Sequence, residues 1–299
     1  MGEAMGSLSQ GKGIMLIIEA PAKLNLTLEV LGKRPDGYHE IRSVMQTVSL
    51  HDKLSFQPAN GINITSGSTE WKPEESLVSR AVSLVQRATS CSRGAAIEME
   101  KHIPLVAGLG GDSSDAAATL RGLNQLWELG LSQRKLLELA AQLGSDVPFF
   151  IDGGTALAEG RGELLTPLTP HPRMWFVLVV PDVPRLPEKT KRLYASLKPE
   201  HFTDGHITQR MIEVLKEGKE VTHSLLFNIF ENIAFAPGSK LRLYRELIAR
   251  MGTDNIHLAG SGPSLFSLVK DEAQADDLYT RCKDQGMEAY VAGTRAGYS

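Results

Sequence analysis

The chain has 299 residues, of which 42% are hydrophobic and 22% charged, and its formal net charge is −3. This length allows two domains or one large one, and the near-neutral charge argues against a nucleic-acid partner. No apolar run approaches the ~20 residues that a membrane-spanning helix needs, so we expect no membrane partner. Two cysteines without metal or redox spacing, and a start without the apolar core of a secretory signal, favour a cytoplasmic location.

The first half of the chain is predicted to mix strands and helices. Leucines alternate with polar residues from Ile17 to Val30, a second strand-like run covers Ile41 to Leu50, and turn residues between them predict a hairpin. Helices are predicted over 74–90, through 116–127 and over 132–143, with Ser132 as the N-cap of the last. A strand is predicted over 96–101.

The second half begins after a cluster of prolines near residue 168. We expect a buried strand from Met174 to Pro181, a strand over 255–259, another strand, a helix over 271–286 and a final strand. Strands and helices interspersed in both halves predict an α+β or α/β fold. The predicted organisation is a disordered extension over 1–14, a domain over 15–168 and a second domain over 169–299.

A glycine-rich segment, PLVAGLGGDSSDAA, covers residues 104–117 just before a predicted helix. Glycines let backbone N–H groups turn inward, and a helix start adds unpaired N–H groups, so this segment is suited to phosphate. Ser113 and Ser114 could donate to phosphate or ligate a metal; alternatively, they and Asp112 only cap the helix. The usual nucleotide motifs are excluded, because GSLSQGKG lacks the metal-binding hydroxyl and Ser113 replaces the third glycine of a dinucleotide fingerprint.

Three separated motifs resemble those of the GHMP kinases, the superfamily of galactokinase, homoserine kinase, mevalonate kinase and phosphomevalonate kinase. They are APAKLNLTL over 20–28, the glycine-rich segment, and LAGSGPSLFSL over 258–268, in the family's order. The segments RPDGYHEIRSV and LGSDVPFFIDGGTALAEGRGE resemble one branch of this family, and the resemblance runs from Met15 to the C-terminus.

The resemblance implies a two-domain α+β fold with ATP and substrate in the cleft between the domains. The N-terminal, ATP-binding domain would contain a left-handed βαβ unit, and the C-terminal domain would be ferredoxin-like. The implied reaction transfers the γ-phosphoryl group of ATP, with Mg²⁺, to the 2-hydroxyl of 4-diphosphocytidyl-2-C-methyl-D-erythritol in the non-mevalonate isoprenoid pathway. The implied partner is this small molecule, and no protein partner is predicted.

Two residues match the catalytic positions of the family. Asp146 would accept the hydroxyl proton or orient the alcohol during phosphoryl transfer. Lys23 would pair with Asp146 and favour the developing alkoxide, or neutralise charge at the transferred phosphate. Without the resemblance, Asp146 beside glycine and proline would be a turn or cap residue, and Lys23 an ordinary strand lysine.

The resemblance also implies a substrate site. Asn25 lies two residues from Lys23 on the same strand face and would hold the substrate. Aromatic side chains would line the cytidine pocket, and a second glycine loop would contact the diphosphate; these residues are Tyr38, His39, Tyr194, Gly260, Ser261 and Gly262. The alternatives are a hairpin turn with exposed aromatics and a plain turn between strands.

The implied ATP site consists of a lysine and the glycine-rich segment: Lys101, Pro104, Leu105, Val106, Ala107, Gly108, Leu109, Gly110, Gly111, Asp112, Ser113 and Ser114. Lys101 could instead be a surface lysine at a strand end. Asp112 stands where many members have a third consecutive glycine, so we expect it to cap the helix or to contact Mg²⁺, for which Ser113 and Ser114 are other possible ligands. Ser76 replaces an asparagine expected near the adenine.

Three rival functions are considered. Another small-molecule GHMP kinase, of homoserine or mevalonate type, would have no evident use for the Asp36 to His39 segment with Tyr194. A non-catalytic nucleotide-binding protein would not need both Lys23 and Asp146. A metal-dependent hydrolase would need a cluster of His and Asp ligands, which no spacing in the sequence suggests.

Overall fold

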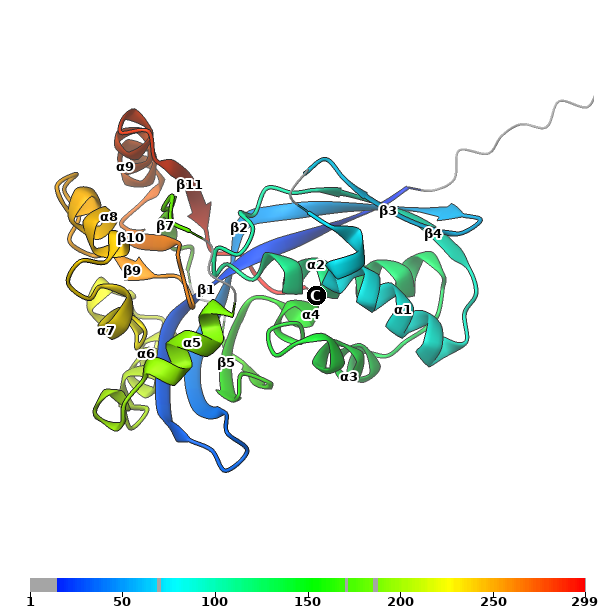
Figure 1. Cartoon of the computed structure of the whole chain (residues 1–299), viewed down its shortest axis with the longest axis horizontal. Helices are drawn as coiled ribbons and strands as arrows, with labels where there is room; N and C mark the ends of the chain where they lie inside the picture. The colour runs from blue at the N-terminus through cyan, green and yellow to red at the C-terminus, as the bar shows by residue number, and fades with distance from the viewer. Residues whose placement is uncertain (1–14, 69–70, 170–171, 185–187, 299) are drawn as a thin grey trace, which may run out of the picture.

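The computed structural model describes residues 15–68, 71–169, 172–184 and 188–298. The predicted extension over 1–14 lies outside these residues. Two β-sheets and surrounding helices form the described part, and Figure 1 shows two long strands, β1 and β2, crossing from a helix-covered end to the smaller sheet. No described helix is long and apolar enough to cross a membrane.

The larger sheet has seven strands. They are β1 (Leu16–Lys33), β2 (His39–Ala59), β3 (Ile62–Ser66), β4 (Gly94–Glu100), β5 (Thr155–Gly160), β6 (Leu164–Pro167) and β8 (Phe227–Asn228). The strands β1 and β2 form the predicted hairpin, with the main order β3-β4-β2-β1-β8 and with β5 pairing to β2 and β6. The apolar side chains of this hairpin are buried in two places: Ala20, Leu54 and Phe56 lie under the helices, whereas Leu24, Leu26 and Val44 lie against the smaller sheet.

Helices cover one face of the larger sheet (Figure 1). They are η1 (Pro73–Glu75), α1 (Leu77–Thr89), α2 (Gly111–Leu126), α3 (Gln133–Leu143) and α4 (Phe149–Asp152). Their apolar faces bury Leu120, Trp127 and Phe150 against strand residues such as Phe56. The parallel neighbours β3 and β4, joined through α1, form a βαβ unit.

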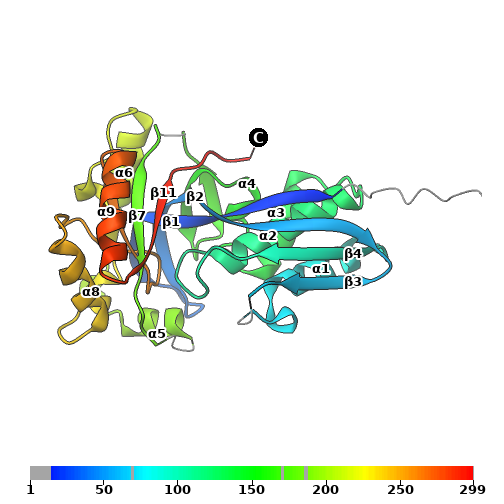
Figure 2. The same ribbon diagram turned by 90° about the horizontal axis from the view of Figure 1, so that it is seen from above.

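The smaller sheet has four strands in the order β11-β7-β10-β9, and every neighbouring pair is antiparallel. They are β7 (Trp175–Val180), β9 (His257–Leu258), β10 (Leu265–Val269) and β11 (Glu288–Gly293). In chain order this is the 4-1-3-2 arrangement of a ferredoxin-like sheet. Figure 2 shows the helix α9 (Glu272–Asp284) on the side of this sheet away from β1 and β2.

The second half also contains the remaining helices. They are α5 (Lys189–Ser196), η2 (Pro199–His201), α6 (His206–Lys216), η3 (His223–Leu225), α7 (Glu231–Ala234), α8 (Lys240–Ala249) and α9 (Glu272–Asp284). The predicted helices α1, α3 and α9 are confirmed, and Ser132 caps α3 by accepting a hydrogen bond from the Lys135 amide. The strand predicted over 255–259 is shorter, because the chain turns at Gly260.

A common core connects the two sheets. Leu24 and Leu26 from β1 pack with Phe176, Leu178 and Phe266 from the smaller sheet. The short strand β8, from the second half of the sequence, also pairs with β1. The division into domains at residue 168 therefore stays a prediction, although the larger sheet's last N-terminal strand, β6, ends at Pro167.

Candidate active site

A cavity of about 1190 Å³ is lined by residues from both halves of the chain. Within the described residues, it brings together every residue predicted for ATP, substrate or catalysis except Leu109 and Ser114. Leu109 is part of the apolar core. Ser114 is buried, and its Oγ has no hydrogen-bond partner within the described part of the chain.

Lys23 and Asp146 lie together in this cavity. Lys23 Nζ is 3.4 Å from Asp146 Oδ2, and the lysine side chain is 6% exposed against 40% for the aspartate. The same Nζ donates a hydrogen bond to Asn25 Oδ1 at 2.7 Å, and Asn25 Nδ2 donates to Ser43 Oγ at 2.8 Å. The ammonium is thus fixed from the strand side, whereas the carboxylate stays open to a ligand.

The glycine-rich segment connects β4 to α2 and contacts the strand β1. Lys23 donates its backbone N–H to the Leu109 carbonyl at 2.9 Å. The residue at the N-cap of α2 is Gly110, with φ of +76°, and no side chain caps it. Asp112 and Ser113, in the first turn, line the cavity. The uncapped helix start therefore leaves its N–H groups for an anion.

The second glycine loop packs directly on the first. Gly108 has φ of +84°, and a Cβ atom there would lie 2.3 Å from the Ala259 carbonyl oxygen. The Ser264 amide donates to the Ala107 carbonyl at 3.1 Å. At Gly260 a Cβ atom would lie 3.4 Å from Lys23 Nζ. Both loops thus reach Lys23 because glycine allows close backbone approach.

Lys101 lines the cavity, but its charge is held by two buried carboxylates. Its Nζ donates to Asp52 Oδ2 and Asp115 Oδ2, both at 2.5 Å. Asp52 Oδ1 also accepts the backbone N–H groups of His102 and Ile103, at 2.5 and 2.7 Å. The cluster of Asp52, Lys101 and Asp115 therefore anchors the start of the glycine-rich segment.

Burial and charge act against each other in this cluster. Burial disfavours the Lys101 ammonium, but Asp115 and Asp52 outweigh it and raise the lysine pKa. Burial holds the pKa of Asp115 well above its ordinary value, despite Lys101. Neither Asp52 nor Asp115 was predicted as a partner of Lys101: Asp52 lies outside the motifs, and Asp115, although part of the glycine-rich segment, carries no local sign of this contact.

His39 and Tyr194, which are far apart in the sequence, stack on one another. Their ring centroids are 5.0 Å apart with an interplanar angle of 24°, and Phe230 meets Tyr194 edge-on at 4.9 Å. Burial lowers the pKa of His39, with a contribution from Lys33, and burial raises the pKa of Tyr194. A nucleobase inserted between the two rings would require a ring separation of about 7 Å, which is two carbon contact distances. Because the centroids are 5.0 Å apart, a nucleobase must stack on the outside of the pair or push the two rings apart.

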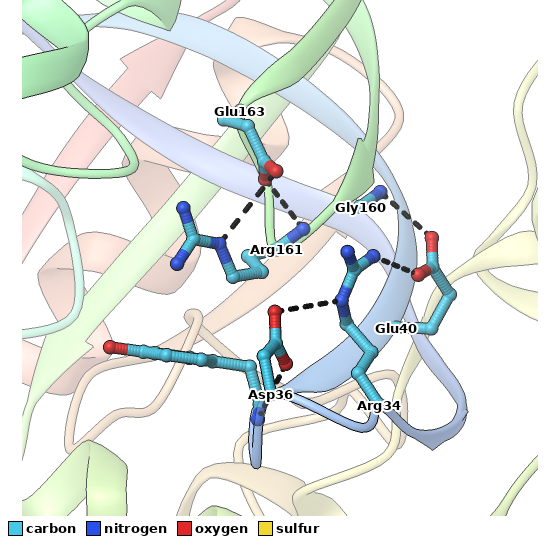
Figure 3. A network of polar contacts seen from close by, with 7 residues as sticks. Arg34, Asp36, Glu40, Gly160, Arg161 and Glu163 are labelled. Atoms are coloured by element: carbon cyan, nitrogen blue, oxygen red, sulfur yellow. Dashed lines mark hydrogen bonds and ion pairs between the residues drawn. The ribbon is translucent and has the colours of Figure 1, made fainter.

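Tyr38 belongs to a polar network at the β1–β2 turn, shown in Figure 3. Its amide donates to Asp36 Oδ1 at 3.0 Å, and Arg161 lies over its ring at 4.8 Å from the centroid. Arg34 pairs with both Asp36 and Glu40 (Figure 3). The phenol ring, more than half exposed, is therefore positioned at the mouth of the cavity.

Ser76 and a cluster of three possible metal ligands do not line the cavity. Ser76 is the N-cap of α1 and accepts the Ser79 amide at 3.2 Å. Glu29, Asp204 and His206 place possible metal-ligand atoms within 4.8 Å of one another, a cluster that the sequence spacing did not suggest. Glu29 accepts the Thr208 amide at 2.7 Å, so its carboxylate already serves the start of α6.

Comparisons with known proteins identify the family of this chain. Residues 76–154 match the family described as GHMP kinases N terminal domain. The chain is 49% identical over 94% of its length to 4-diphosphocytidyl-2-C-methyl-D-erythritol kinase of Dehalococcoides mccartyi, covering 98% of that protein. It is 39% identical, over the same shares of both chains, to the kinase of that name from Geobacillus thermodenitrificans.

Solved structures show the same relation. A crystal structure of 4-(cytidine 5'-diphospho)-2C-methyl-D-erythritol kinase superposes with a TM-score of 0.80 at 32% identity, over 95% of this chain and all of that one. Leishmania major mevalonate kinase shares the fold at a TM-score of 0.72 and 15% identity, over 96% of this chain and 98% of that one. The two-domain α+β GHMP kinase fold predicted from the motifs is confirmed. The chain belongs to the 4-diphosphocytidyl-2-C-methyl-D-erythritol kinase family of the GHMP kinases.

Proposed function

We propose that this kinase transfers the γ-phosphoryl group of ATP to the 2-hydroxyl of 4-diphosphocytidyl-2-C-methyl-D-erythritol through Lys23 and Asp146. The observation that carries this proposal is the 3.4 Å pair of Lys23 and Asp146 in a cavity that also contains the glycine-rich segment and the stacked rings. A phosphate donor and a base-bearing acceptor can therefore meet at one carboxylate.

Asp146 would accept the proton of the attacking hydroxyl. As this proton leaves, the hydroxyl oxygen bonds to the γ-phosphorus, and the bond between the γ-phosphorus and the bridging oxygen of the β-phosphate breaks to release ADP. Lys23, held in place by Asn25, would keep its positive charge beside the reacting oxygen and favour the alkoxide form. Because Lys23 contacts both Asp146 and Asn25, most of the contribution of this pair would come from orientation and charge stabilisation.

ATP would place its phosphates against the glycine-rich segment and the uncapped start of α2. Its Mg²⁺ would find hard oxygen donors in Asp112 and Ser113, which both line the cavity. When bound, this ion would neutralise charge on the phosphates. Ser114 is buried outside the cavity and is the less suitable ligand of the serine pair.

The cytidine would bind near Tyr38, His39 and Tyr194, whose rings supply stacking surfaces. Homoserine and mevalonate carry no base, so this part of the cavity favours the cytidine-bearing acceptor over those substrates. A cytoplasmic location is in keeping with the free thiols of Cys91 and Cys282.

The test is turnover with ATP, Mg²⁺ and 4-diphosphocytidyl-2-C-methyl-D-erythritol, followed by ADP release and phosphorus NMR of the product. We expect phosphorylation at the 2-hydroxyl, and a kcat lower by about 10²–10⁴ in Asp146→Asn because the proton acceptor is lost. ATP affinity should be unchanged in that variant. Turnover of homoserine or mevalonate instead would contradict the proposed acceptor, and full activity of Asp146→Asn would contradict the role of Asp146.

A further inference from the structure

Most of the cations that line the cavity have a carboxylate partner. Those with a partner are Lys23, Lys101, Arg161 and Lys191. Lys33 and Lys189 form no ion pair within the described residues, and the Lys189 ammonium donates a hydrogen bond to the neutral carbonyl oxygen of Gly262. A lysine ammonium has three donors, so this contact leaves capacity for another acceptor.

The Lys189 ammonium is also partly removed from water. Burial alone lowers its pKa to about 8. Titratable groups on the same cavity wall include Glu188 and Lys191 on its own segment and Asp112, Lys23 and Asp146 elsewhere, but the lowered pKa of Lys189 comes from desolvation and not from these charges. An ammonium that is desolvated without a counter-charge is unfavourable, and a bound anion would restore its stability.

The position of Lys189 indicates which anion it would meet. Thr190 Oγ1 and Ser261 Oγ are 2.9 Å apart, so the start of α5 is bound to the second glycine loop. Tyr194, on the same helix, stacks on His39. Lys189 and Tyr194 both line the cavity, so α5 contributes an ammonium and an aromatic ring to the same space, the two groups that the phosphates and the base of one ligand would need.

We propose that Lys189 binds the diphosphate group of the cytidine-bearing substrate, an inference that rests on the proposed function. The Gly262 carbonyl orients the ammonium, and its remaining N–H groups donate to phosphate oxygens in charge-assisted hydrogen bonds. Tyr194 holds the base end and Lys189 the diphosphate end of the same molecule, so that α5 sets the position of the acceptor.

Binding to substrate fragments tests this directly. Calorimetric titration of the whole protein with CDP, cytidine and ADP compares wild type with Lys189→Met, which keeps the length of the side chain without its charge. We expect the dissociation constant of CDP to rise at least about 10-fold in the variant, since hydrogen bonds to charged groups contribute this much. The variant should bind cytidine and ADP with dissociation constants within about 2-fold of wild type, because neither ligand loses a hydrogen bond to Lys189 under this proposal.

Controls separate charge from folding. Arg192→Met removes an exposed charge from the same helix outside the cavity and should leave CDP affinity unchanged. Lys189→Arg should restore most of the CDP affinity. In steady-state kinetics Lys189→Met should raise the acceptor KM at least about 10-fold with little change in kcat, because uniform binding is lost.

The pH profile adds a measurement that a purely structural role would not change. In wild type, kcat/KM for the acceptor should fall as pH rises above about 8, because the free enzyme's Lys189 then loses its proton. This fall should be absent in Lys189→Met. Equal CDP affinity in wild type and Lys189→Met would overturn the proposal, as would loss of ADP affinity in place of CDP affinity. A wild-type protein that binds ADP but no CDP would overturn the proposed substrate as well.

Discussion

At the scale of single residues, the site combines an accessible carboxylate with buried charges that hold the backbone. Asp146 is open to a ligand, whereas Asp52 and Asp115 lie beneath the cavity wall and fix Lys101. The motif comparison predicted a lysine near ATP at position 101. The structure adds that two carboxylates bind its ammonium, so Lys101 anchors the start of the glycine-rich segment.

Asp115 has a measurable consequence for stability. Burial raises its pKa in the folded protein above the ordinary 3.8, so the native state takes up a proton at a higher pH than the unfolded chain does. The free energy of unfolding of wild type, compared with that of Asp115→Asn, should therefore increase as the pH falls from 7 through the pKa of Asp115 in the folded protein. The increase should be complete below 3.8, the ordinary pKa of an aspartate.

Urea unfolding between pH 4.5 and 7.5 would measure this difference, and the same substitution at exposed Asp254 provides a control. Parallel pH curves for wild type and Asp115→Asn would contradict a raised pKa at Asp115.

At the scale of elements, the two glycine loops form one surface. A side chain at Gly108 would meet the Ala259 carbonyl at 2.3 Å, so the first loop can follow this path only without a Cβ atom. The loops belong to different sheets, and their contact therefore sets the position of the glycine-rich segment relative to Lys23.

Gly108→Ala should separate these loops and lower kcat/KM by about 100-fold, the effect expected of an active-site displacement of about 1 Å. The matched control is Gly130→Ala, because Gly130 also has a positive φ, +64°, but a Cβ atom there would have nothing within 4 Å. That variant should lose about 1–2 kcal/mol of stability from the left-handed conformation and keep its kinetics. Steady-state kinetics and thermal unfolding of both variants test this prediction. An equal loss of kcat/KM in the two variants would show that the contact between the loops does not cause the loss.

At the scale of the whole molecule, the core crosses the predicted domain boundary. Leu24 and Leu26 of the larger sheet pack with Phe176 and Phe266 of the smaller one, and β8 returns from the second half to pair with β1. The shared core thus connects the two halves whose residues line the cavity.

We expect the protein to unfold in a single cooperative transition. Trp127 and Trp175 lie in different parts of the fold, so tryptophan fluorescence and far-UV circular dichroism in urea should give the same midpoint. Leu26→Ala, in the shared core, should lower the free energy of unfolding by about 2–5 kcal/mol without splitting the transition. Two separate transitions would instead support independent folding on either side of residue 168.

Much of the architecture could be predicted from local patterns in the sequence. Alternation of apolar and polar residues indicated the hairpin of β1 and β2, and helical spacing with an N-cap serine indicated α3, because these signals depend on neighbours within a few residues. The strands β3, β5, β6 and β8 were not predicted. The sequence of β5, TALAEG, is rich in alanine and glycine and becomes a strand through its pairing with β2.

For the site, the sequence by itself determined which residue types were available: a glycine-rich segment before a helix, a lysine and an aspartate in family motifs, and aromatics at a turn. Tertiary structure alone decided their partners. Asp52 reaches Lys101 across 49 positions, and Lys189 meets the Gly262 carbonyl across 73. Charge pairing and desolvation depend on distances in space between residues far apart in the chain, and no local pattern encodes them.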